Sequence, residues 1–484
     1  MNARGTLPGH WIDGAWTGGR ADAVSTNPSR PHEEIARFRV GTADEVDAAV
    51  AAARRAGPSW SAAGGVARGR VLRRAAQVLE GRADELVALF VAEEGKTAPE
   101  ARGEVARAVE TLHYNAARAL ASVGATFDAA TDGVVAHVRR VPVGVVAAIT
   151  PWNFPVAIPV WKLAPALAHG NTVVWKPSEL VPATSTLLLQ ILAEAGLPDG
   201  ALAMVLGDGT TGGHLIGHEG IDAASFTGSA ATGQRILDIA GPRGIRLQLE
   251  LGGHNPAIVF ADADLAAAAE HVVAGAMLST GQKCTATRRV LVAEKVHDEL
   301  LDRIVDRAAA LRVGDAAAAT TDVGPLVSAD ALTRVRGAVA RAEAQGATVC
   351  TGDAIPDGPG HLVAPTVLSV PSHDLDVCHE EVFGPVTAVL PVADDDAAFR
   401  LANDTTYGLS AAVHTRDPAR IRRALDELEV GMLTVNGPTT GAEPHVPFGG
   451  VKGSSGPAGR EMGEAARDFY TDTRTAYLDH RFGP

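Results

Sequence analysis

Short apolar runs typical of β-strands alternate with alanine-rich helical patterns along most of this 484-residue chain. The clearest strand-like runs are 145–149, 172–175, 203–206, 223–226, 257–260 and 290–293. Helical patterns such as 183–195 and 232–239 lie between them. Apolar strands separated by helices of this length indicate βαβ units, which form parallel sheets with helices on their faces. The alternation therefore predicts an α/β fold.

The length of the chain predicts more than one domain, because single domains rarely exceed about 250 residues. One α/β unit extends over about 143–252, and the pattern restarts near residue 254 with a long apolar helix. The segment 123–142 and the C-terminal tail have an extended, β-type pattern. Exposed strands need a partner, so we expect these two segments to pair with each other and to mediate self-association.

Composition and charge argue against several classes of protein. The formal net charge is −14, whereas nucleic-acid binding needs clustered Lys and Arg. Residues 141–161 carry no charge and could span a bilayer by length, but four prolines interrupt them. Lipid cannot satisfy the backbone groups that such breaks free, so we predict a buried strand followed by a functional loop. We expect neither a nucleic-acid partner nor a membrane partner.

The cysteines are three in number, too few and too scattered for a disulfide framework or a cysteine-based zinc site. Free thiols suit a reducing cytoplasm, and the N-terminus lacks the basic start and apolar stretch of a signal peptide. We therefore expect a cytoplasmic protein. Cys350 and Cys378 are interpreted as small buried hydrophobic residues.

Cys284 lies in a small, polar, glycine-containing context, STGQKCTATRR, just after a helical pattern. A thiol is an effective nucleophile only as the thiolate, which needs nearby positive charge or a general base. Lys283 and Lys162 are candidate sources of that charge. A lone cysteine is more often a buried hydrophobe than a nucleophile, so Cys284 alone identifies no function.

Two further polar residues stand in unusual contexts. Glu250 ends an apolar strand-like run and precedes Leu251, Gly252 and Gly253. Burial there would raise its pKa and make it a usable base, although most strand-end glutamates are merely solvated. Asn153 lies between aromatic residues and prolines in ITPWNFP, where its amide could stabilise an oxyanion or simply cap a turn.

Two glycine-containing segments are candidates for nucleotide binding. GDGTTG, residues 207–212, is a literal GxGxxG after a strand-like run, but no acidic residue closes a strand at the expected distance. FTGSAATGQRI, residues 226–236, joins a strand end to a helix whose free N–H groups could hold a pyrophosphate. The residues alone leave both candidates open.

Taken together and in this order, ITPWNFP, WKPSE, FTGS, LELGG, GQKC, EEVFGP and PFGG resemble the signature motifs of the aldehyde dehydrogenase superfamily. The resemblance runs from HWIDGAW to GREMGEAARDFY, and the spacing of Glu250 and Cys284 also fits. It implies a Rossmann-type cofactor domain (1–122 and 143–252) and an α/β catalytic domain (253–452). It also implies a small β oligomerisation element (123–142 and 453–484) that forms a homodimer or homotetramer.

The resemblance implies oxidation of an aldehyde to a carboxylate with NAD(P)⁺ through a thioester, without a metal. Cys284 would be the nucleophile, Glu250 the base that activates water, and Asn153 an oxyanion donor together with the Cys284 backbone N–H. A carboxylate at 250 favours hydrolysis over acyl transfer to coenzyme A. Lys162 and Glu461 match a proton-relay pair in relatives, and a structural salt bridge is the equal alternative.

Cofactor contacts are implied for ten positions, and these are Trp152, Lys176, Glu179, Gly209, Gly228, Ser229, Gly233, Leu251, Glu381 and Phe383. Lys176 and Glu179 would hold the adenosine ribose, and Ser229 with its helix would bind the pyrophosphate. Glu381 and Phe383 would contact the nicotinamide side. By the same resemblance GDGTTG lines the adenine side. A carboxylate at 179 would repel a 2′-phosphate, so NAD is the preferred cofactor.

The context of Cys284 and the HVPFGG segment resemble enzymes that act on α-ketoglutaric semialdehyde and related oxo-acid aldehydes. Lys283 and His445 could favour an anionic substrate, although Lys283 could equally reach the surface. Phe154, Trp161 and Phe448 should line the substrate tunnel, which leaves aromatic and aliphatic aldehydes, or an aminoaldehyde, as alternatives. A redox-independent thiol esterase and a non-catalytic relative are the alternatives from other classes. ELGGH departs from the commoner ELGGK at His254.

Overall fold

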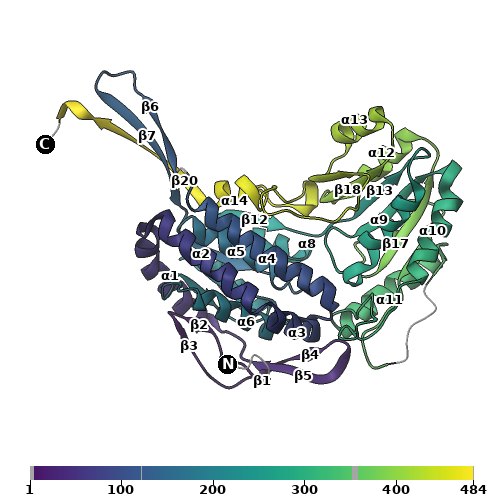
Figure 1. The fold of residues 1–484 in the computed structure, drawn as a ribbon, viewed down its shortest axis with the longest axis horizontal. Coiled ribbons are helices and arrows are strands. Elements are labelled where there is room, and N and C mark those ends of the chain that lie inside the picture. The colour runs from purple at the N-terminus through teal and green to yellow at the C-terminus, as the bar shows by residue number, and fades with distance from the viewer. Residues whose placement is uncertain (1–4, 122, 352–357, 483–484) are drawn as a thin grey trace.

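The computed structural model describes residues 5–121, 123–351 and 358–482. Two seven-stranded sheets, each covered by helices, form two α/β units, and a narrow three-stranded sheet projects from the body (Figure 1). A second three-stranded sheet lies near the N-terminus; its strands are β1 (Gly5–Thr6), β4 (Ala23–Asn27) and β5 (Arg30–Phe38). The predicted α/β fold is confirmed.

The first large sheet has the order β12-β11-β8-β9-β10-β2-β3. Its parallel strands are β8 (Val145–Ile149), β9 (Thr172–Lys176), β10 (Leu202–Met204), β11 (Ala223–Thr227) and β12 (Arg246–Glu250). An antiparallel hairpin, β2 (Trp11–Ile12) and β3 (Ala15–Trp16), extends the edge. These strands coincide with four of the predicted apolar runs because each is buried on both faces, as parallel sheets require.

Helices cover both faces of this sheet. One core holds α1 (Ala43–Ala62), α7 (Gly209–Gly217) and α8 (Ala230–Ala240). The other holds α2 (Gly64–Gly81), α3 (Ala83–Glu94), α4 (Ala98–Arg118), α5 (Ala157–Ala168) and α6 (Pro182–Glu194). A capping box opens α1, where Thr42 and Glu45 bond to each other's backbone N–H groups.

The second large sheet has the order β15-β16-β17-β14-β13-β18-β19 and is parallel except at β15. Its strands are β13 (Asn255–Val259), β14 (Thr287–Ala293), β15 (Thr348–Val349), β16 (Thr366–Ser369), β17 (Val386–Val392), β18 (Ser410–His414) and β19 (Met432–Val435). One core holds α9 (Leu265–Met277) and α10 (His297–Ala309). The other holds α11 (Ala329–Ala344), α12 (Asp395–Asn403) and α13 (Pro418–Glu427).

The projecting sheet consists of β6 (Gly124–Asp128), β7 (Val134–Pro142) and β20 (Thr471–Asp479). β20 pairs antiparallel with β7 along its whole length, which confirms the predicted pairing of the two extended segments. The tail is not extended throughout, however. Residues Gly463–Tyr470 form helix α14, because Ala466, Phe469 and Tyr470 lie at helical spacing and join the core of the first unit.

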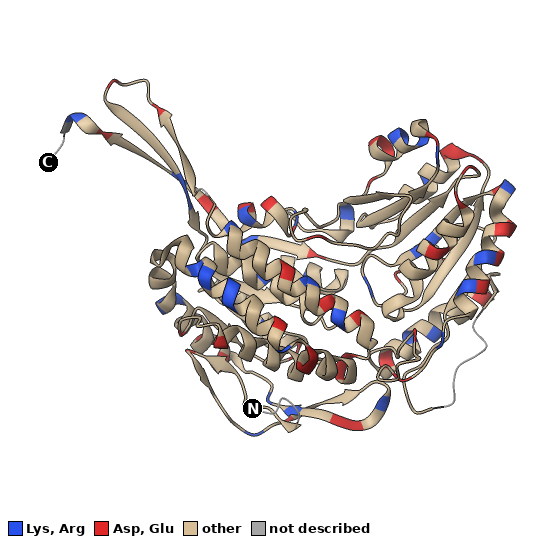
Figure 2. Cartoon of the chain, viewed as in Figure 1, with Lys and Arg blue, Asp and Glu red and all other residues tan. Residues whose placement is uncertain are grey.

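None of the described helices combines the length and apolar character that crossing a bilayer requires. The uncharged segment 141–161 contains strand β8, a loop and the start of α5, as the interrupting prolines indicated. Charged side chains of both signs are interspersed along helices such as α10 and α11 (Figure 2).

Arg68 fixes the ends of two helices from within the first unit. Its guanidinium donates to the carbonyl of Ala168 at the end of α5 (2.9 Å) and to that of Ser61 in the last turn of α1 (2.8 Å). Helix ends leave carbonyls without intrahelical partners, and these carbonyls are buried. Arg68 therefore connects the helix that carries Lys162 to the outer layer.

Replacing Arg68 by methionine should lower the free energy of unfolding by about 2–4 kcal/mol, because buried carbonyls lose their donors. The midpoint of urea denaturation measures the loss. Arg73→Met is the matched control, since Arg73 is exposed on the same helix, and should change stability by less than about 0.5 kcal/mol. Equal midpoints for the two variants would contradict this role of Arg68.

Candidate functional site

A cavity of about 360 Å³ lies between α4, α5 and the end of β12 on one side and segments 274–285 and 440–448 on the other. Its wall brings together Glu250, Cys284 and Glu461, which are far apart in the sequence. Apolar rings of Phe154, Trp161 and Phe448 complete it; the Trp161 and Phe448 ring centroids are 5.3 Å apart. A thiol, two carboxylates and an apolar chamber therefore share one site.

Cys284 follows a sharp reversal of the chain after α9. Ser279, Thr280 and Gly281 all have positive φ, and a side chain at 281 would lie 2.0 Å from the Gly384 carbonyl oxygen. The Cys284 carbonyl accepts from Asn255 Nδ2 at 2.7 Å. Cys284 is thus fixed by its backbone, leaving its side chain on the cavity wall.

Burial raises the pKa of the Cys284 thiol to about 12, and the nearby carboxylates of Glu381 and Glu250 add to the shift. Of the two predicted sources of positive charge, Lys283 interacts electrostatically with Cys284. Lys162 is committed to Glu461, and burial lowers the pKa of Lys283 to about 8. The resting thiol is neutral, so its activation needs a base.

Glu250 ends β12 with its side chain buried. Burial, and then the charge of Glu461, raises the pKa of Glu250 well above its usual value, as predicted for a buried strand-end carboxylate. Ser455 Oγ donates to Oε1 at 3.0 Å, whereas Oε2 has no hydrogen-bond partner among the residues described. A side chain at Gly449 would lie 2.5 Å from Oε1. Glu250 therefore offers a free oxygen and a raised proton affinity, as a general base requires.

Lys162 and Glu461 form a buried ion pair that also reaches Ser225. Lys162 Nζ donates to Ser225 Oγ at 2.9 Å, and that hydroxyl donates to Gln248 Oε1 at 2.9 Å. Glu461 also lines the cavity and influences Glu250 electrostatically. The pair has the contacts of a salt bridge and the position of a proton relay, so both interpretations stay open.

Asn153 is fixed at both its side chain and its backbone. Its Nδ2 donates to the Gln282 carbonyl at 2.9 Å, and its own carbonyl accepts from Lys96 Nζ at 2.7 Å. Lys96 is paired with Glu104 at 2.7 Å, both side chains being 1–2% exposed. Glu104 also accepts the backbone N–H groups that follow the Asn153 loop, those of Val156 and Ala157.

The Lys96–Glu104 pair escaped the sequence analysis, although a signal was present. Glu104 lies among Ala101, Val105 and Ala108 on the apolar stripe of α4. A charged residue inside an apolar stripe indicates a buried partner, since unpaired buried charges are strongly unfavourable. Arg107, on the same face of α4, also lines the cavity and was likewise missed.

The two predicted substrate-side cations lie in different places. Lys283 lines the cavity and donates to the Ala274 carbonyl at 3.0 Å, so the alternative of a surface-reaching side chain is wrong. His445 does not line this cavity. Its side chain is 63% exposed and lies 3.7 Å from Glu443, because the loop before Pro447 turns it outward into a neighbouring surface hollow.

A groove of about 400 Å³ runs along the carboxyl ends of β8, β9 and β11, next to the cavity. Of the predicted cofactor residues it is lined by Trp152, Lys176, Glu179, Gly209, Gly228 and Ser229. The N-termini of α7 and α8 open into it, with Asp208 and Ser229 as their N-caps. Thr227, which lines both hollows, has a buried hydroxyl without a partner among the described residues. These features fit a dinucleotide at the switch point of a parallel sheet.

Four further predicted cofactor residues lie outside this groove. A side chain at Gly233 would lie 2.6 Å from Leu251, so this glycine lets α8 pack on Leu251. Glu381 and Phe383 line an adjoining hollow of about 210 Å³ that Trp152 shares. Glu381 accepts from the Gly253 N–H at 3.1 Å, and burial raises its pKa to about 6. Glu381 and Phe383 therefore lie beside the groove, and Gly233 and Leu251 support it.

His254, the departure from the commoner motif, is fully buried beside this loop. Its Nε2 lies 3.2 Å from the Val377 carbonyl oxygen, four residues before Glu381 in the sequence. Burial and the charges of Arg289 and Arg288 lower the pKa of His254 well below its usual value. A neutral ring thus connects the LELGG segment to the segment that carries Glu381.

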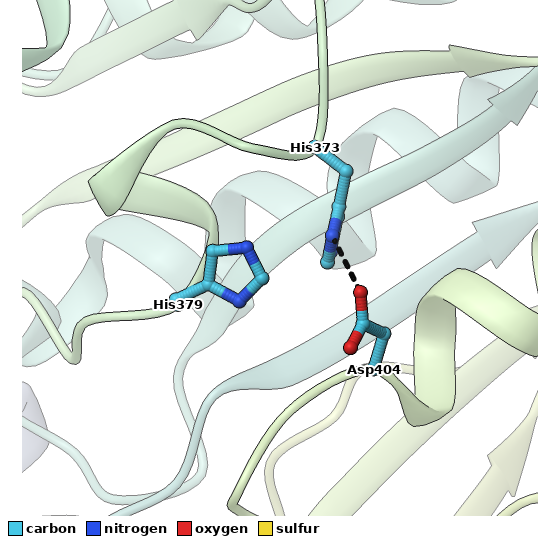
Figure 3. Close-up of side chains that lie close together, drawn as sticks. All are labelled: His373, His379 and Asp404. Carbon is cyan, nitrogen blue, oxygen red and sulfur yellow. Dashed lines mark ion pairs between the residues drawn. The ribbon is translucent and has the colours of Figure 1, made fainter.

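His373, His379 and Asp404 lie close together in a separate cluster (Figure 3), and none of the three lines the cavity. Such a set has the ligand types of a metal site. However, His373 Nε2 accepts from Arg289 Nη1 at 2.8 Å, and His373 Nδ1 lies 3.3 Å from Asp404. A neutral ring that accepts from Arg289 must carry its proton on Nδ1, where it faces Asp404. The cluster therefore satisfies Arg289 and presents no free nitrogen of His373 to a metal.

Comparison with known proteins agrees with this arrangement. A family model described as "Aldehyde dehydrogenase family" matches residues 16–476. The chain is 44% identical over 475 residues to an alpha-ketoglutarate semialdehyde dehydrogenase of Haloferax volcanii, covering 97% of this chain and 98% of the relative. It is 38% identical over 476 residues to an alpha-ketoglutaric semialdehyde dehydrogenase of Bacillus subtilis, covering 97% of each.

Solved structures give the same result. A betaine aldehyde dehydrogenase from Staphylococcus aureus, in complex with NAD⁺, superposes with a TM-score of 0.94 at 32% identity, covering 99% of this chain and 95% of that one. A putative aldehyde dehydrogenase from Burkholderia cenocepacia has a TM-score of 0.94 at 37% identity, covering 98% of each chain.

The electrostatic environment of Cys284 can be tested by alkylation. At pH 8 the Glu381 carboxylate is ionised, because its pKa is about 6, and its charge disfavours the thiolate. Glu381→Gln should therefore accelerate iodoacetamide labelling of Cys284 about three- to tenfold, as a lowered thiol pKa requires. Peptide mass spectrometry separates Cys284 from Cys350 and Cys378.

The matched control is Glu380→Gln, because Glu380 is exposed and paired with Arg341 at 3.0 Å. This variant should label at the unmodified rate. Slower or unchanged labelling of Glu381→Gln would show that its carboxylate does not act on the thiol.

Proposed function

Because the chain belongs to the aldehyde dehydrogenase family, we propose that it oxidises an oxo-acid semialdehyde to the corresponding dicarboxylate with NAD⁺. The observation that carries the reaction is the shared cavity of Cys284 and Glu250, open beside the groove at the sheet edge. The substrate class rests on the names of the relatives and on the cationic residues Lys283 and Arg107 of the cavity.

We assign the nucleophilic step to Cys284 and Glu250. Cys284 Sγ attacks the aldehyde carbon, and Glu250 accepts the thiol proton through its free oxygen. The oxyanion that forms is stabilised by the Asn153 amide and the Cys284 backbone N–H, each donor contributing roughly 3 kcal/mol. The product of this step is a hemithioacetal bound to the enzyme. Bound NAD⁺ supplies the hydride acceptor that converts it to a thioester.

Glu250 then acts on water. Once the proton has left it, the carboxylate removes a proton from a water molecule that attacks the thioester carbon. The C–S bond breaks, the thiol is restored and the carboxylic acid leaves as its anion. Lys162 and Glu461 lie next to Glu250 and provide a route for the protons released. The indole N–H of Trp161 has no hydrogen-bond partner among the described residues. It is therefore available to donate a hydrogen bond to the substrate.

The preference for NAD over NADP rests on Glu179. Its carboxylate is 46% exposed in the groove and lies 3.4 Å from Lys176 Nζ. It can accept from a ribose 2′-hydroxyl, whereas a 2′-phosphate would face a like charge. We assign cofactor binding to the unit of the first sheet and the nucleophile to the unit of the second. The free state of all three cysteines suits a cytoplasmic location.

The reaction is tested with purified protein, a panel of oxo-acid, aromatic, aliphatic and amino aldehydes, and NAD⁺ or NADP⁺ in turn. Formation of reduced cofactor should be fastest with the oxo-acid semialdehydes and NAD⁺, and Cys284→Ala should abolish it. Glu250→Gln should slow the first burst of reduced cofactor and lose at least about a hundredfold in steady turnover, since neither the thiol nor the attacking water then has its base.

Other outcomes discriminate the alternatives. If kcat/KM is highest with aromatic or aliphatic aldehydes, those aldehydes are the substrate class. The apolar rings of the cavity would then select the substrate. Ester hydrolysis without cofactor and without aldehyde oxidation would favour a thiol esterase. No turnover by folded protein with a reactive Cys284 would favour a binding protein.

We also propose that the chain forms a homodimer or homotetramer through the projecting sheet. Large apolar side chains are exposed there, with Phe127 at 55% and Tyr477 at 71%. The sheet extends away from both α/β units and can reach another copy (Figure 1). Exposed strands with apolar side chains are favoured as pairing surfaces.

A double change, Phe127→Asp with Tyr477→Asp, should convert the assembly to a species near the 49.8 kDa of one chain. Light scattering after size-exclusion chromatography measures the mass. Leu425→Asp is the control, because Leu425 is 67% exposed on α13, far along the chain from this sheet. Unmodified protein with the mass of one chain would rule out the assembly.

A further inference from the structure

We propose that Arg107 binds the carboxylate of the substrate and thereby determines the preference for acidic semialdehydes. This inference rests on the proposed function and names the residue that selects the substrate.

Arg107 lies on the face of α4 that forms one side of the cavity. Glu100, Gly103, Glu104 and Arg107 recur at helical spacing, and all line it. Arg107 alone of these four also lines the neighbouring surface hollow that contains His445. It is half-buried, so its side chain stands where the cavity meets the surface. A substrate whose aldehyde reaches Cys284 would direct its far end toward this opening.

The other cations of the cavity are already engaged. Lys96 donates to Glu104 and to the Asn153 carbonyl, both at 2.7 Å. Lys283 donates to the Ala274 carbonyl, is next to the nucleophile in the sequence, and has a pKa lowered to about 8 by burial. It stands at the aldehyde end of the cavity, whereas the carboxylate of a semialdehyde is several bonds away.

Four carboxylates share a wall with Arg107, Glu100 and Glu104 in the cavity and Glu110 and Glu443 in the surface hollow, and none of the four forms an ion pair with it. Glu100 accepts from the N–H groups of Thr97 (3.1 Å) and Ser279 (2.6 Å), and Glu104 is paired with Lys96. Within 5–121, 123–351 and 358–482, Arg107 has no ion-pair partner. An unpaired, half-buried guanidinium at the entrance of an apolar chamber is a complementary site for a carboxylate.

The chemistry of arginine suits this role better than that of the predicted His445. A guanidinium stays charged over the working pH range and offers a planar pair of donors that matches a carboxylate. His445 is 63% exposed, faces Glu443 and does not reach the cavity. Binding the carboxylate at Arg107 would orient the chain of the substrate with its aldehyde toward Cys284, an advantage that a neutral aldehyde lacks.

The test compares two substrates of equal length, 5-oxopentanoate and pentanal, which differ in the terminal carboxylate. In Arg107→Ala, kcat/KM for 5-oxopentanoate should fall about 10- to 100-fold, through KM, as loss of a charge-assisted bond implies. For pentanal it should stay within about twofold. Arg107→Lys should lie between, because one ammonium replaces the paired donors. Glutarate, a non-reactive dianion, should inhibit the unmodified enzyme competitively and lose that effect in Arg107→Ala.

The control variant is Arg102→Ala on the same helix. Arg102 has a side chain that is 63% exposed, with Asp84 at 4.0 Å, and does not line the cavity. This variant should keep the ratio of the two substrates. If Arg107→Ala also keeps it, or loses both substrates equally, the role of Arg107 is overturned while the substrate class stands. If the unmodified enzyme does not favour 5-oxopentanoate over pentanal, both the substrate class and the role of Arg107 fall.

Discussion

A short connection with little conformational freedom joins the two α/β units. β12 ends at Glu250 and β13 begins at Asn255, so four residues carry the chain from the first large sheet into the second. Added side chains would lie 2.2 Å from Glu381 at Gly252 and 2.5 Å from the Cys284 carbonyl oxygen at Gly253. Only glycine permits this approach. The connection therefore sets how far the carboxylate of one unit lies from the thiol of the other.

Burial at this junction raises the proton affinity of both the thiol and the carboxylate. Burial raises the pKa of Cys284 to about 12 and that of Glu250 well above its usual value. Oxidation proceeds through the thiolate, so a protonated Cys284 is protected from peroxide while no substrate is bound. Two buried ion pairs lie beside these groups: Lys96 with Glu104 fixes the backbone of the Asn153 loop, and Lys162 with Glu461 is bonded to Ser225.

Much of the fold was predictable because its signals are local. Buried parallel strands give apolar runs, and the capping box at Thr42 marks the start of α1. The site was harder, since its parts come from distant segments. Lys96 and Glu104 meet the Asn153 loop across more than fifty positions, and nothing near ITPWNFP reveals them. His445 was expected at the substrate because it precedes PFGG, but the direction of a loop side chain depends on packing that sequence does not show. The helical start of the tail was missed because the strand pattern that follows it is stronger.

The C-terminal tail contributes both to the cavity and to the projecting sheet. It first supplies Glu461 to the cavity wall and then, after the short helix α14, becomes strand β20 of the projecting sheet. Tyr470, at the end of that helix, is buried in the core of the first unit, and its carbonyl accepts from Asn171 Nδ2 at 2.9 Å. Along the C-terminal segment, a mechanical load on the projecting sheet would thus reach the anchored helix α14 before it reached Glu461.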